Sequence, residues 1–493
     1  MNRKKVISVV SLIVVLAAVA SVLVACNYYK WDSVGAGDSG ANVVSNGGYF
    51  VQQGGYVYFI NGYVGDNAAN DWGTPYKQSI MRAKIGADGT IDNSSAVVVV
   101  PKSIYNSSVN GGFAVFGDWI YYATPNNDED KSGTPSTTHT DFMRTKTDGT
   151  VTQLIATINS RSSEFLFTPS RILYRTDTAT VHYIDFSGMS TTKAVNNGKG
   201  ATSGVLIENA TSILWGYDAD WSPSAGTVVS DYVFYTQSIT GDESYKHYNT
   251  LCAVKYDGSD RRTLATFDSY FDEGDTYENS YQKIFTFSLA DLYFESDDTV
   301  TLYYNKSIYE DSSSKSVGLY SNTFSLTSAF DVKAEKRIAA SSITSFFPLG
   351  GDRGILVAKD NNTYILKDVT DNYDESDIVI GGERAATVQA VIGDYVYYTV
   401  SGGTALYRIN LDKATGASPN EDKVIASGVK SDWLSLEFAG NRLYYFNTDD
   451  YSYVSYVDLN AYEGKELTAT MIGKMTSEDA AAKEEAEKKE NEE

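Results

Sequence analysis

The chain repeats one short pattern, in which an apolar alternating strand runs into a two-residue turn and then into a strand rich in tyrosine. The clearest copy is Val388-Gln389-Ala390-Val391-Ile392, followed by Gly393-Asp394-Tyr395-Val396-Tyr397-Tyr398. Eight such turns occur along the chain, at Gly54-Gly55, Gly117-Asp118, Ser170-Arg171, Ser230-Asp231, Ala290-Asp291, Asp352-Arg353, Gly393-Asp394 and Gly440-Asn441. A repeat at this spacing limits the architecture before the chemistry of any single residue is considered.

A second hairpin follows the tyrosine strand in several copies. Its turns include Asp88-Gly89, Asp148-Gly149 and Asp257-Gly258, and Asp-Gly between alternating runs is a strong hairpin signal. Two hairpins in series make a four-stranded antiparallel sheet that is apolar on both faces, and stacking such sheets in a ring buries both faces. We therefore predict an all-β fold, a single β-propeller over residues 49–470, with seven or eight blades and eight preferred. A solenoid or a pair of β-sandwiches is the alternative architecture.

The first residues have the pattern of an export signal. Arg3, Lys4 and Lys5 precede an apolar stretch over residues 6–25, which ends in Leu23-Val24-Ala25-Cys26. This ending resembles the lipobox of bacterial lipoproteins, and the resemblance implies that Cys26 is lipidated after removal of residues 1–25. Residues 26–48 are then a Gly/Ser/Asn-rich tether. The chain is expected at the cell membrane, lipid-anchored and facing the extracellular side; an uncleaved membrane-spanning anchor is the alternative.

A family resemblance is carried by Ile172-Leu173-Tyr174-Arg175-Thr176-Asp177, by the strand that begins at Val181-His182-Tyr183-Ile184, and by the segment from Cys252 to Leu264. These segments resemble the YWTD propeller repeat of low-density-lipoprotein-receptor-type proteins, with Arg175 at the position usually held by Trp. The chain is also similar to surface lipoproteins of Gram-positive bacteria that carry a YWTD-like propeller of unassigned function. The resemblance covers residues 49–461 and implies the fold, whereas it implies almost nothing about activity.

Charge and cysteine content narrow the classes of partner. The formal net charge of −23 argues against a nucleic-acid partner, because such proteins carry basic patches. Cys26 and Cys252 are the only cysteines, so no internal disulfide is expected once Cys26 is acylated; Cys252 should pack beside Val254 as a small apolar side chain. The charged tail over residues 471–493 has Glu484/Lys488 and Glu485/Lys489 at helical spacing, which predicts a partly helical or disordered segment.

No catalytic residue can be assigned from the sequence. His139 and His247 are expected in loops and His182 in a third strand, without neighbours at metal-ligand spacing. There is no nucleophile elbow, phosphate-binding glycine loop or zinc-protease motif. No cofactor is predicted, and the many carboxylates are interpreted as solvated surface charges.

Geometry predicts where a ligand would bind. In a four-stranded blade, the connection between the second and third strands and the link to the next blade emerge on one face of the ring. Long segments at 61–78 and 123–140 are predicted on that face, and segments around 214–221 and 267–277 are interpreted as links between blades. The candidate ligand-binding residues in these segments are Trp72, Tyr76, Trp215, Tyr217, Trp221 and Tyr270. Asp268, Asp272, Glu273 and Asp275 are a weaker candidate site for Ca²⁺.

Aromatic rings beside carboxylates suit stacked sugars and also protein or peptide anchors. The favoured interpretation is a membrane-anchored, extracytoplasmic, non-enzymatic binding module for an envelope protein, peptide or glycan. A carbohydrate-active enzyme (a glycan hydrolase or lyase) with carboxylates near the central channel is the alternative, and a structural role in the envelope is the third. A solute-binding transport lipoprotein is disfavoured because its alternating helices and parallel strands are absent from the sequence pattern.

Overall fold

The structure is a computed structural model, and it describes 25 segments of the chain. They are residues 43–44, 50–60, 79–104, 112–126, 139–160, 164–175, 177, 179–193, 198–215, 231–240, 247–268, 284–296, 298–310, 313–328, 335–339, 346–349, 354–359, 363–367, 375–381, 384–411, 421–429, 436–439, 441–447, 453–474 and 477–492. The predicted signal peptide, Cys26 and most of the predicted tether lie outside these residues.

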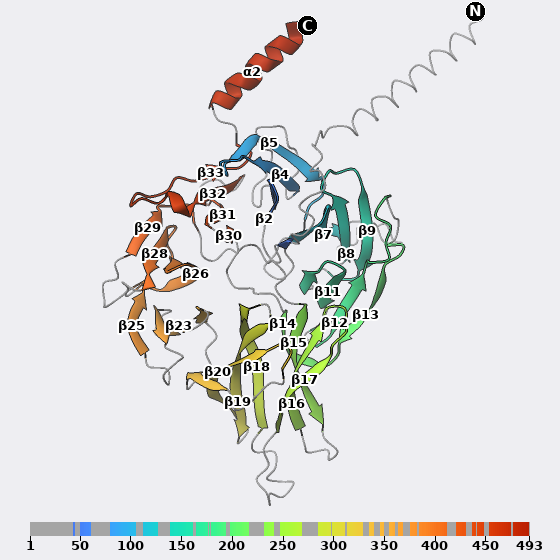
Figure 1. Cartoon of the computed structure of the whole chain (residues 1–493), viewed down its shortest axis with the longest axis vertical. Helices are drawn as coiled ribbons and strands as arrows, with labels where there is room; N and C mark the ends of the chain where they lie inside the picture. The colour runs from blue at the N-terminus through green and yellow to red at the C-terminus, as the bar shows by residue number, and fades with distance from the viewer. Residues whose placement is uncertain are drawn as a thin grey trace, which may run out of the picture.

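Consecutive strands form antiparallel sheets that follow one another around a ring (Figure 1). The first three of these sheets contain β2 (Phe50–Gln53), β3 (Tyr56–Ile60), β4 (Ile80–Ile85) and β5 (Ile91–Val100); β6 (Phe113–Phe116), β7 (Trp119–Asn126), β8 (His139–Lys146) and β9 (Thr152–Ile158); and β10 (Glu164–Phe167), β11 (Arg171–Arg175), β12 (Val181–Asp185) and β13 (Thr202–Ile207).

The next three sheets continue the same order of strands. They contain β14 (Ala210–Trp215), β15 (Tyr232–Thr240), β16 (His247–Lys255) and β17 (Arg262–Asp268); β18 (Ile284–Ser296), β19 (Thr299–Glu310), β20 (Ser313–Ser325) and β21 (Lys336–Ala339); and β22 (Phe346–Pro348), β23 (Ile355–Lys359), β24 (Thr363–Lys367) and β25 (Glu375–Ile380).

The last two sheets bring the chain back to the start of the ring. They contain β26 (Ala386–Ile392), β27 (Tyr395–Val400), β28 (Leu406–Asn410) and β29 (Glu421–Ile425), and β30 (Glu437–Ala439), β31 (Arg442–Phe446), β32 (Val454–Asp458) and β33 (Thr470–Met471). A 3-10 helix, η5 (Leu459–Ala461), follows β32, and the helix α2 (Ser477–Glu492) extends away from the ring (Figure 1).

The predicted all-β propeller with four-stranded antiparallel blades is therefore confirmed. The preference for eight four-stranded blades is wrong. Seven of the described sheets have four strands, and the remaining sheet has five. The fifth strand is β1 (Val43–Val44), which pairs with β6 through Val43 and Val115 and through Val44 and Ala114. The sequence pattern predicts Val43 and Val44 in the tether, because two residues are too few to show a strand period.

The tyrosine strands form the second strand of their blades, as predicted, with one exception. Ala290 and Asp291 do not form a turn; they lie inside β18, where the pairing with β19 shifts by one residue between Leu289 and Asp291. The turn of this blade precedes Thr299, and β19 provides the second strand. The bulge in this long strand has the same residue pattern as the turns, because a small residue and an aspartate precede alternating apolar residues in each case.

The core consists of the interfaces between neighbouring blades. Val57, Phe59 and Ile120 belong to one buried cluster that joins the first two blades, while Phe142, Phe165 and Phe167 belong to the next. Cys252 is 4% exposed and shares a buried cluster with Val254, as predicted. Because each sheet buries both faces against its neighbours, the ring is held by side-chain packing and not by backbone pairing between blades.

The first and last blades close the ring through side chains. Phe50 of β2 stacks on Tyr444 of β31 with ring centroids 3.4 Å apart. The Tyr456 hydroxyl lies 3.4 Å from the Ile91 amide nitrogen, which donates to it. Asn93 donates to the Lys474 carbonyl at 3.3 Å and accepts from the Gly473 amide at 3.2 Å. Apart from β1, each described blade is formed by consecutive strands, so these contacts between distant segments carry the closure.

Candidate functional site: the two faces of the ring

The order of strands gives the ring two different faces. The first and third strands of each blade end at one face, which carries the connections between strands one and two and between strands three and four; we call this the tight-turn face. The second and fourth strands end at the opposite face, which carries the remaining connections; we call this the loop-rich face. Gly393-Asp394, between β26 and β27, lies on the tight-turn face.

An aromatic–arginine pair recurs beside the tight-turn face. In three blades, an aromatic residue begins the second strand and an arginine lies diagonally opposite on the third strand: Tyr56 with Arg82 at 5.1 Å, Trp119 with Arg144 at 4.4 Å and Tyr395 with Arg408 at 4.3 Å. In two blades the residue types are exchanged, as Arg171 with Tyr183 at 4.3 Å and Arg442 with Tyr456 at 6.0 Å. Cation–π attraction accounts for the pairing, since it requires one residue of each type and not a fixed order.

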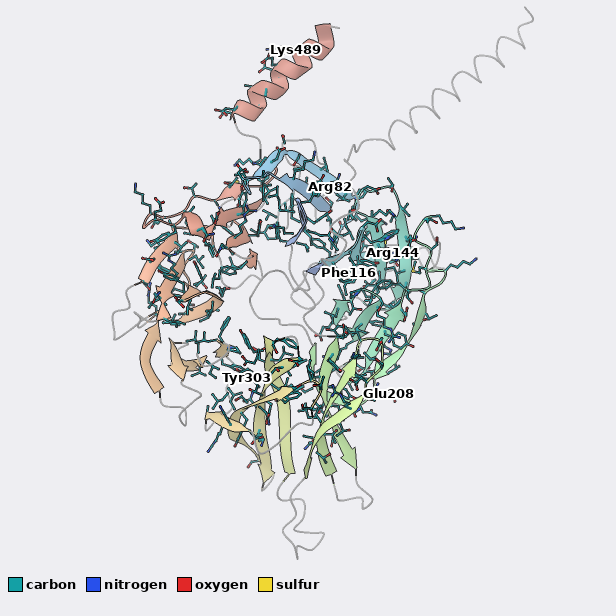
Figure 2. The ribbon with its side chains drawn as sticks, viewed as in Figure 1. Arg82, Phe116, Arg144, Glu208, Tyr303 and Lys489 are labelled. Carbon is teal, nitrogen blue, oxygen red and sulfur yellow. The ribbon has the colours of Figure 1, made fainter. Side chains whose placement is uncertain are left out.

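These arginines also reach the neighbouring blade. Arg82, Arg144 and Arg171 donate to the carbonyl oxygens of Thr147, Ser190 and Tyr256 at 2.9, 3.1 and 3.0 Å, and Arg442 donates to the carbonyl of Gly89. Arg408 instead lies 4.3 Å from the ring of Tyr462. Arg82 and Arg144 are buried, and Figure 2 labels them on adjacent blades. The repeated pair therefore joins one blade to the next. It was not predicted from the sequence, although the exchange of residue types between copies is visible in the printed sequence.

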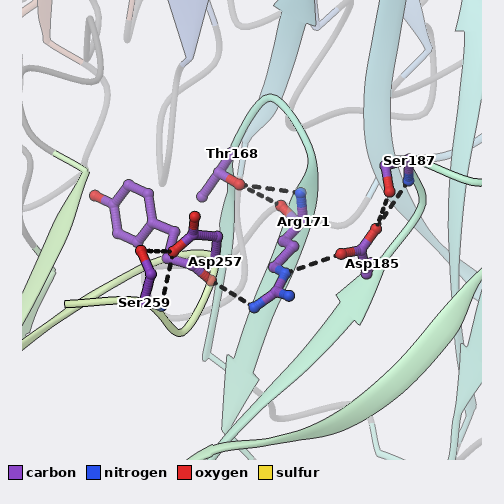
Figure 3. Close-up of polar contacts among 7 residues, drawn as sticks. Thr168, Arg171, Asp185, Ser187, Asp257 and Ser259 are labelled. Carbon is purple, nitrogen blue, oxygen red and sulfur yellow. Dashed lines mark hydrogen bonds and ion pairs between the residues drawn. The ribbon is translucent and has the colours of Figure 1, made fainter. Parts of the chain in front are cut away.

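Aspartates order the turns that receive these arginines. Asp185 accepts from the amide and hydroxyl of Ser187 at 3.0 and 2.6 Å and from Arg171 at 3.1 Å, as Figure 3 shows. Partial burial opposes ionisation of Asp185, but these hydrogen bonds outweigh it and lower the pKa of the carboxyl. Asp257 accepts from Ser259 in the same way, and these bonds lower its pKa. At these described turns, the tight-turn face is therefore occupied by hydrogen bonds of the protein itself.

The loop-rich face carries most of the predicted insertions. Trp72 and Tyr76 belong to the connection between β3 and β4, and residues 127–138 to the connection between β7 and β8. Tyr270, Asp272, Glu273 and Asp275 belong to the link between β17 and β18. All of these residues lie outside the described part of the chain, so only the strand ends that bound the segments are placed.

The prediction for the aromatic segment around Trp215 is wrong in its position. Trp215 ends β14, the first strand of its blade, and the chain returns as β15 at Tyr232. Tyr217 and Trp221, which lie outside the described residues, therefore belong to a connection between strands one and two and not to a link between blades. That connection starts and ends at the tight-turn face. The difference arises because the residues before Trp215 form β14, the first strand of a blade, and not a link between blades.

The metal prediction stays untested where it was made. Asp268 ends β17, and its proposed companions lie outside the described residues. Among the residues that the structure describes, no group of three or more His, Cys, Asp or Glu side chains is close enough to hold a metal ion. His182 lies in β12 as predicted and stacks on Tyr174 at 5.1 Å. His139 and His247 were expected in loops, but they begin β8 and β16.

Two tyrosine pairs lie at the loop-rich ends of their blades, each covered by a cation. Tyr304 and Tyr320 stack with centroids 6.3 Å apart, and the Lys306 ammonium lies 4.4 Å from the Tyr320 ring and 2.5 Å from a carboxylate oxygen of Glu335. Tyr398 and Tyr407 stack at 5.6 Å, with Arg384 at 4.9 Å from the Tyr407 ring and 2.5 Å from Glu421.

These tyrosines are already engaged within the protein. Burial raises the pKa of Tyr304 and Tyr398 above the usual range, and each hydroxyl donates to the neighbouring glutamate. A ring whose face is covered by a cation of the same chain does not offer that face to a sugar or a peptide. The candidate aromatic contacts of the loop-rich face are therefore in the insertions and not in these pairs.

Two neighbouring blades extend beyond the others. β18, β19 and β20 continue past their blade in a three-stranded extension, in which Thr286 pairs with Ser307 and Ser307 with Ser316. β15 and β16 continue in the same manner as far as Thr240 and His247. Figure 1 shows these strands at the bottom of the view, projecting past the outline of the ring. The extensions end at the loop-rich face, because that is where second strands end and third strands begin.

Asp291 is the described carboxyl with the clearest raised pKa. It lies at the bulge of β18, the innermost strand of its blade, and accepts the Leu292 amide at 2.8 Å. Burial raises the pKa of Asp291 to about 6. A carboxyl that is held partly protonated near neutral pH is the type of group that a general acid requires.

The pKa of Asp291 also predicts a pH-dependent effect on stability. Because the folded-state pKa is raised, the folded protein favours the protonated carboxyl, and stability is lost as the pH rises from about 4 through about 6. Asp291→Asn should therefore leave stability nearly unchanged at pH 4 and raise it by about 1–2 kcal/mol at pH 7.5. Chemical unfolding at both pH values checks this; a stabilisation equal at both would mean that the ionisation of Asp291 is not its cause.

Comparison with known proteins adds similarity of fold only. No protein-family model matches the chain, and no curated protein matches it in sequence. Among solved structures, apo AztD from Citrobacter koseri is 12% identical, with a TM-score of 0.39, over 85% of this chain and 95% of that one.

Two further structures are similar at a comparable level. The β-propeller domain of Cps50 (Swd1) from Myceliophteria thermophila is 9% identical, with a TM-score of 0.31, over 69% of this chain and 93% of that one. Sqt1 from Saccharomyces cerevisiae is 7% identical, with a TM-score of 0.35, over 73% and 83%. At these identities and scores the matches carry no functional argument.

Proposed function

We propose that the chain is a lipid-anchored, extracytoplasmic binding module that holds a protein, peptide or glycan on its loop-rich face. One observation supports the binding face: the strands that bound residues 61–78, 127–138 and 269–283 all meet these segments at the same face of the ring. Loops gathered on one side of a rigid scaffold are a common arrangement for binding sites. The aromatic residues Trp72, Tyr76 and Tyr270 in these segments suit both sugar stacking and the anchoring of a peptide.

The anchor is proposed from sequence. The basic start at Arg3, the apolar stretch over residues 6–25 and Cys26 after Leu-Val-Ala support an exported, acylated chain. None of the described helices is long and apolar enough to span a bilayer. The YWTD-like assignment and a Gram-positive origin are part of the same proposal and are supported by the segments around Ile172 and Cys252.

The binding test uses two tryptophans that the strand order places on different faces. The purified full chain is screened on a glycan array and against proteins of an envelope extract, and the best ligand is titrated. Trp72→Ala should weaken binding by about 30-fold, since buried aromatic anchors contribute about 2 kcal/mol or more. Trp215→Ala, at the tight-turn face, is the matched control and should leave affinity within about twofold. Loss of affinity in the control alone would contradict the proposed face.

A carbohydrate-active enzyme is the second candidate, and Asp291 is the observation that favours it. Its raised pKa and its place in the innermost strand of a blade fit a proton donor near the central channel. Incubation of the chain with envelope polysaccharides and an assay for new reducing ends tests this candidate. Activity that Asp291→Asn reduces by about 100-fold or more would support it. Activity that survives the substitution would exclude Asp291 as the acid.

A further inference from the structure

The direction of β1 shows on which side the preceding chain reaches the ring. β6 is the first strand of its blade, and it ends at Phe116 immediately before the turn at Gly117, on the tight-turn face. β1 pairs antiparallel to β6, with Val43 opposite Val115 and Val44 opposite Ala114. β1 therefore runs from the tight-turn face towards the loop-rich face. Val43, its first residue, is the one nearer the tight-turn face.

The position of β1 in the sheet adds a second constraint. The order of strands is β1-β6-β7-β8-β9, so β1 lies on the inner edge of its sheet, at the side of the central channel. It also bridges two blades, because residues 45–49 lead from β1 into β2, which belongs to the blade beside β6. The chain before Val43 is thus led to the inner edge of the ring at the tight-turn face.

We propose that the tight-turn face is directed towards the membrane and that the loop-rich face is directed away from it. This inference rests on the lipid anchor at Cys26 in the proposed function. Residues 27–42 separate Cys26 from β1, and sixteen residues span at most about 55 Å when fully extended. A route around the rim must pass out under four strands, spaced about 4.8 Å apart, and then climb the outer side of a blade. That path takes about 40–50 Å and leaves almost no chain to reach the bilayer. The other path would return through the central channel beside β1, and it also uses chain that a direct exit at the tight-turn face leaves free.

The proposed orientation assigns different tasks to the faces. At the described turns of the tight-turn face, arginine and aspartate side chains are engaged in contacts within and between blades, such as Arg171 with Asp185 and Tyr256. The loop-rich face, with its insertions, is presented to the medium. β33 is a fourth strand and ends on the loop-rich face, so the acidic tail begins on the side away from the membrane. A partner of the loop-rich face therefore approaches from the outside, without competition from lipid.

The test measures the distance of each face from lipid. Asp394 and Ser401 are exposed and lie at opposite ends of the same strand, β27, with about 20 Å between them. The lipidated full chain carrying Asp394→Cys or Ser401→Cys is labelled with a donor dye and placed in phosphatidylcholine vesicles that contain acceptor-labelled lipid. Cys252 is 4% exposed and does not compete for dye; unlabelled wild type is the background. Energy transfer from position 394 should exceed that from position 401 by at least about twofold.

A variant of β1 tests the cause of the orientation. Val43→Pro with Val44→Pro removes the backbone donors of β1 while leaving all four-stranded blades intact. The difference in energy transfer should then disappear, because the tether would leave from β2 at the loop-rich face. A difference that persists in this variant would overturn the role of β1, and a thermal unfolding curve confirms that the ring is folded.

The outcomes separate this inference from the proposed function. Equal transfer from both positions in a lipidated chain, or stronger transfer from position 401, overturns the orientation and leaves the anchor standing. If mass spectrometry instead shows Cys26 unmodified and the chain does not bind vesicles, the anchor itself is wrong and the orientation falls with it.

Discussion

Arg144→Met should lower the free energy of unfolding by about 2–4 kcal/mol. Arg144 is 3% exposed and donates to Gln153 at 2.6 Å, to the Tyr121 hydroxyl at 3.3 Å and to the Ser190 carbonyl at 3.1 Å. Methionine fills a similar volume but provides no donor, so buried acceptors lose their partner and the stacking on Trp119 is lost. Because Ser190 belongs to the next blade, the substitution weakens the contact between blades as well as one sheet.

The matched control lies two residues away on the same strand. Lys146 is paired with Asp118 at 2.6 Å and also lies over Trp119, but both members of the ion pair are partly exposed. Lys146→Met should therefore cost less than about 1 kcal/mol. Urea unfolding of the three proteins measures the difference. Equal losses in the free energy of unfolding would mean that the contact between blades made by Arg144 stabilises the protein no more than the partly exposed ion pair of Lys146.

Phe50→Ala and Tyr444→Ala should each destabilise the protein by about 3–5 kcal/mol, because both side chains are almost fully buried where the last blade meets the first. Their rings stack at 3.4 Å, so the double variant should lose less than the sum of the single variants. The expected coupling is about 1 kcal/mol. A matched pair away from the closure is Phe142 and Phe165, with centroids 5.3 Å apart, and its variants should show similar single losses.

The two pairs should differ in what happens to the shape of the molecule. Loss of the Phe142–Phe165 contact weakens one of several interior boundaries between blades. Loss of Phe50 or Tyr444 weakens the boundary at which the ring closes, where no connecting segment leads from the last strand of one blade to the first strand of the other. Small-angle scattering of the folded variants checks this. We expect a larger radius for the closure variants alone; an increase for both pairs would argue against a special role of closure.

The sequence predicted the fold because the repeated features are local. Turn residues such as Gly393 and Gly117 have φ near +58°, which glycine tolerates best, and the alternating residues after each turn lie between neighbouring blades. The pairs Glu484/Lys488 and Glu485/Lys489 form in α2 at 2.7 and 2.8 Å, because helical spacing fixes both neighbours. Properties set by a few adjacent residues can be read from a single sequence.

The features that sequence analysis missed depend on partners far along the chain. Asp291 resembles a turn residue until its pairing with Tyr303 of β19 is known. Trp215 could be assigned to a face only after β14 was recognised as a first strand. The arginine–aromatic pairs were visible as an exchange between Tyr56/Arg82 and Arg171/Tyr183, but their use as contacts between blades required the carbonyls of Thr147 and Tyr256. β1 could not be predicted, because two adjacent valines do not indicate a strand until their pairing with β6 is known.

The sequence predicts less of the candidate site than of the fold, for a physical reason. Loops on a scaffold carry few of the periodic signals that define strands, so Trp72, Tyr76 and Tyr270 can be assigned to a connection but not to a geometry. What the strand order adds is the side of the ring. It separates these residues from Trp215, Tyr217 and Trp221, which the sequence had placed with them, and it thereby reduces the proposed ligand-binding residues to one half of the original set.

Ring closure underlies every proposal, and a covalent cross-link between the first and last blades tests it most directly. Asn93 is the third residue of β5, and its side chain donates to the Lys474 carbonyl at 3.3 Å, although the two residues are far apart in sequence. Asn93→Cys with Lys474→Cys, treated with a short thiol-specific cross-linker and mapped by mass spectrometry, should give an intramolecular link between the two peptides in most molecules. An open arrangement of the same blades would leave both cysteines singly modified, and that result would contradict the closed ring.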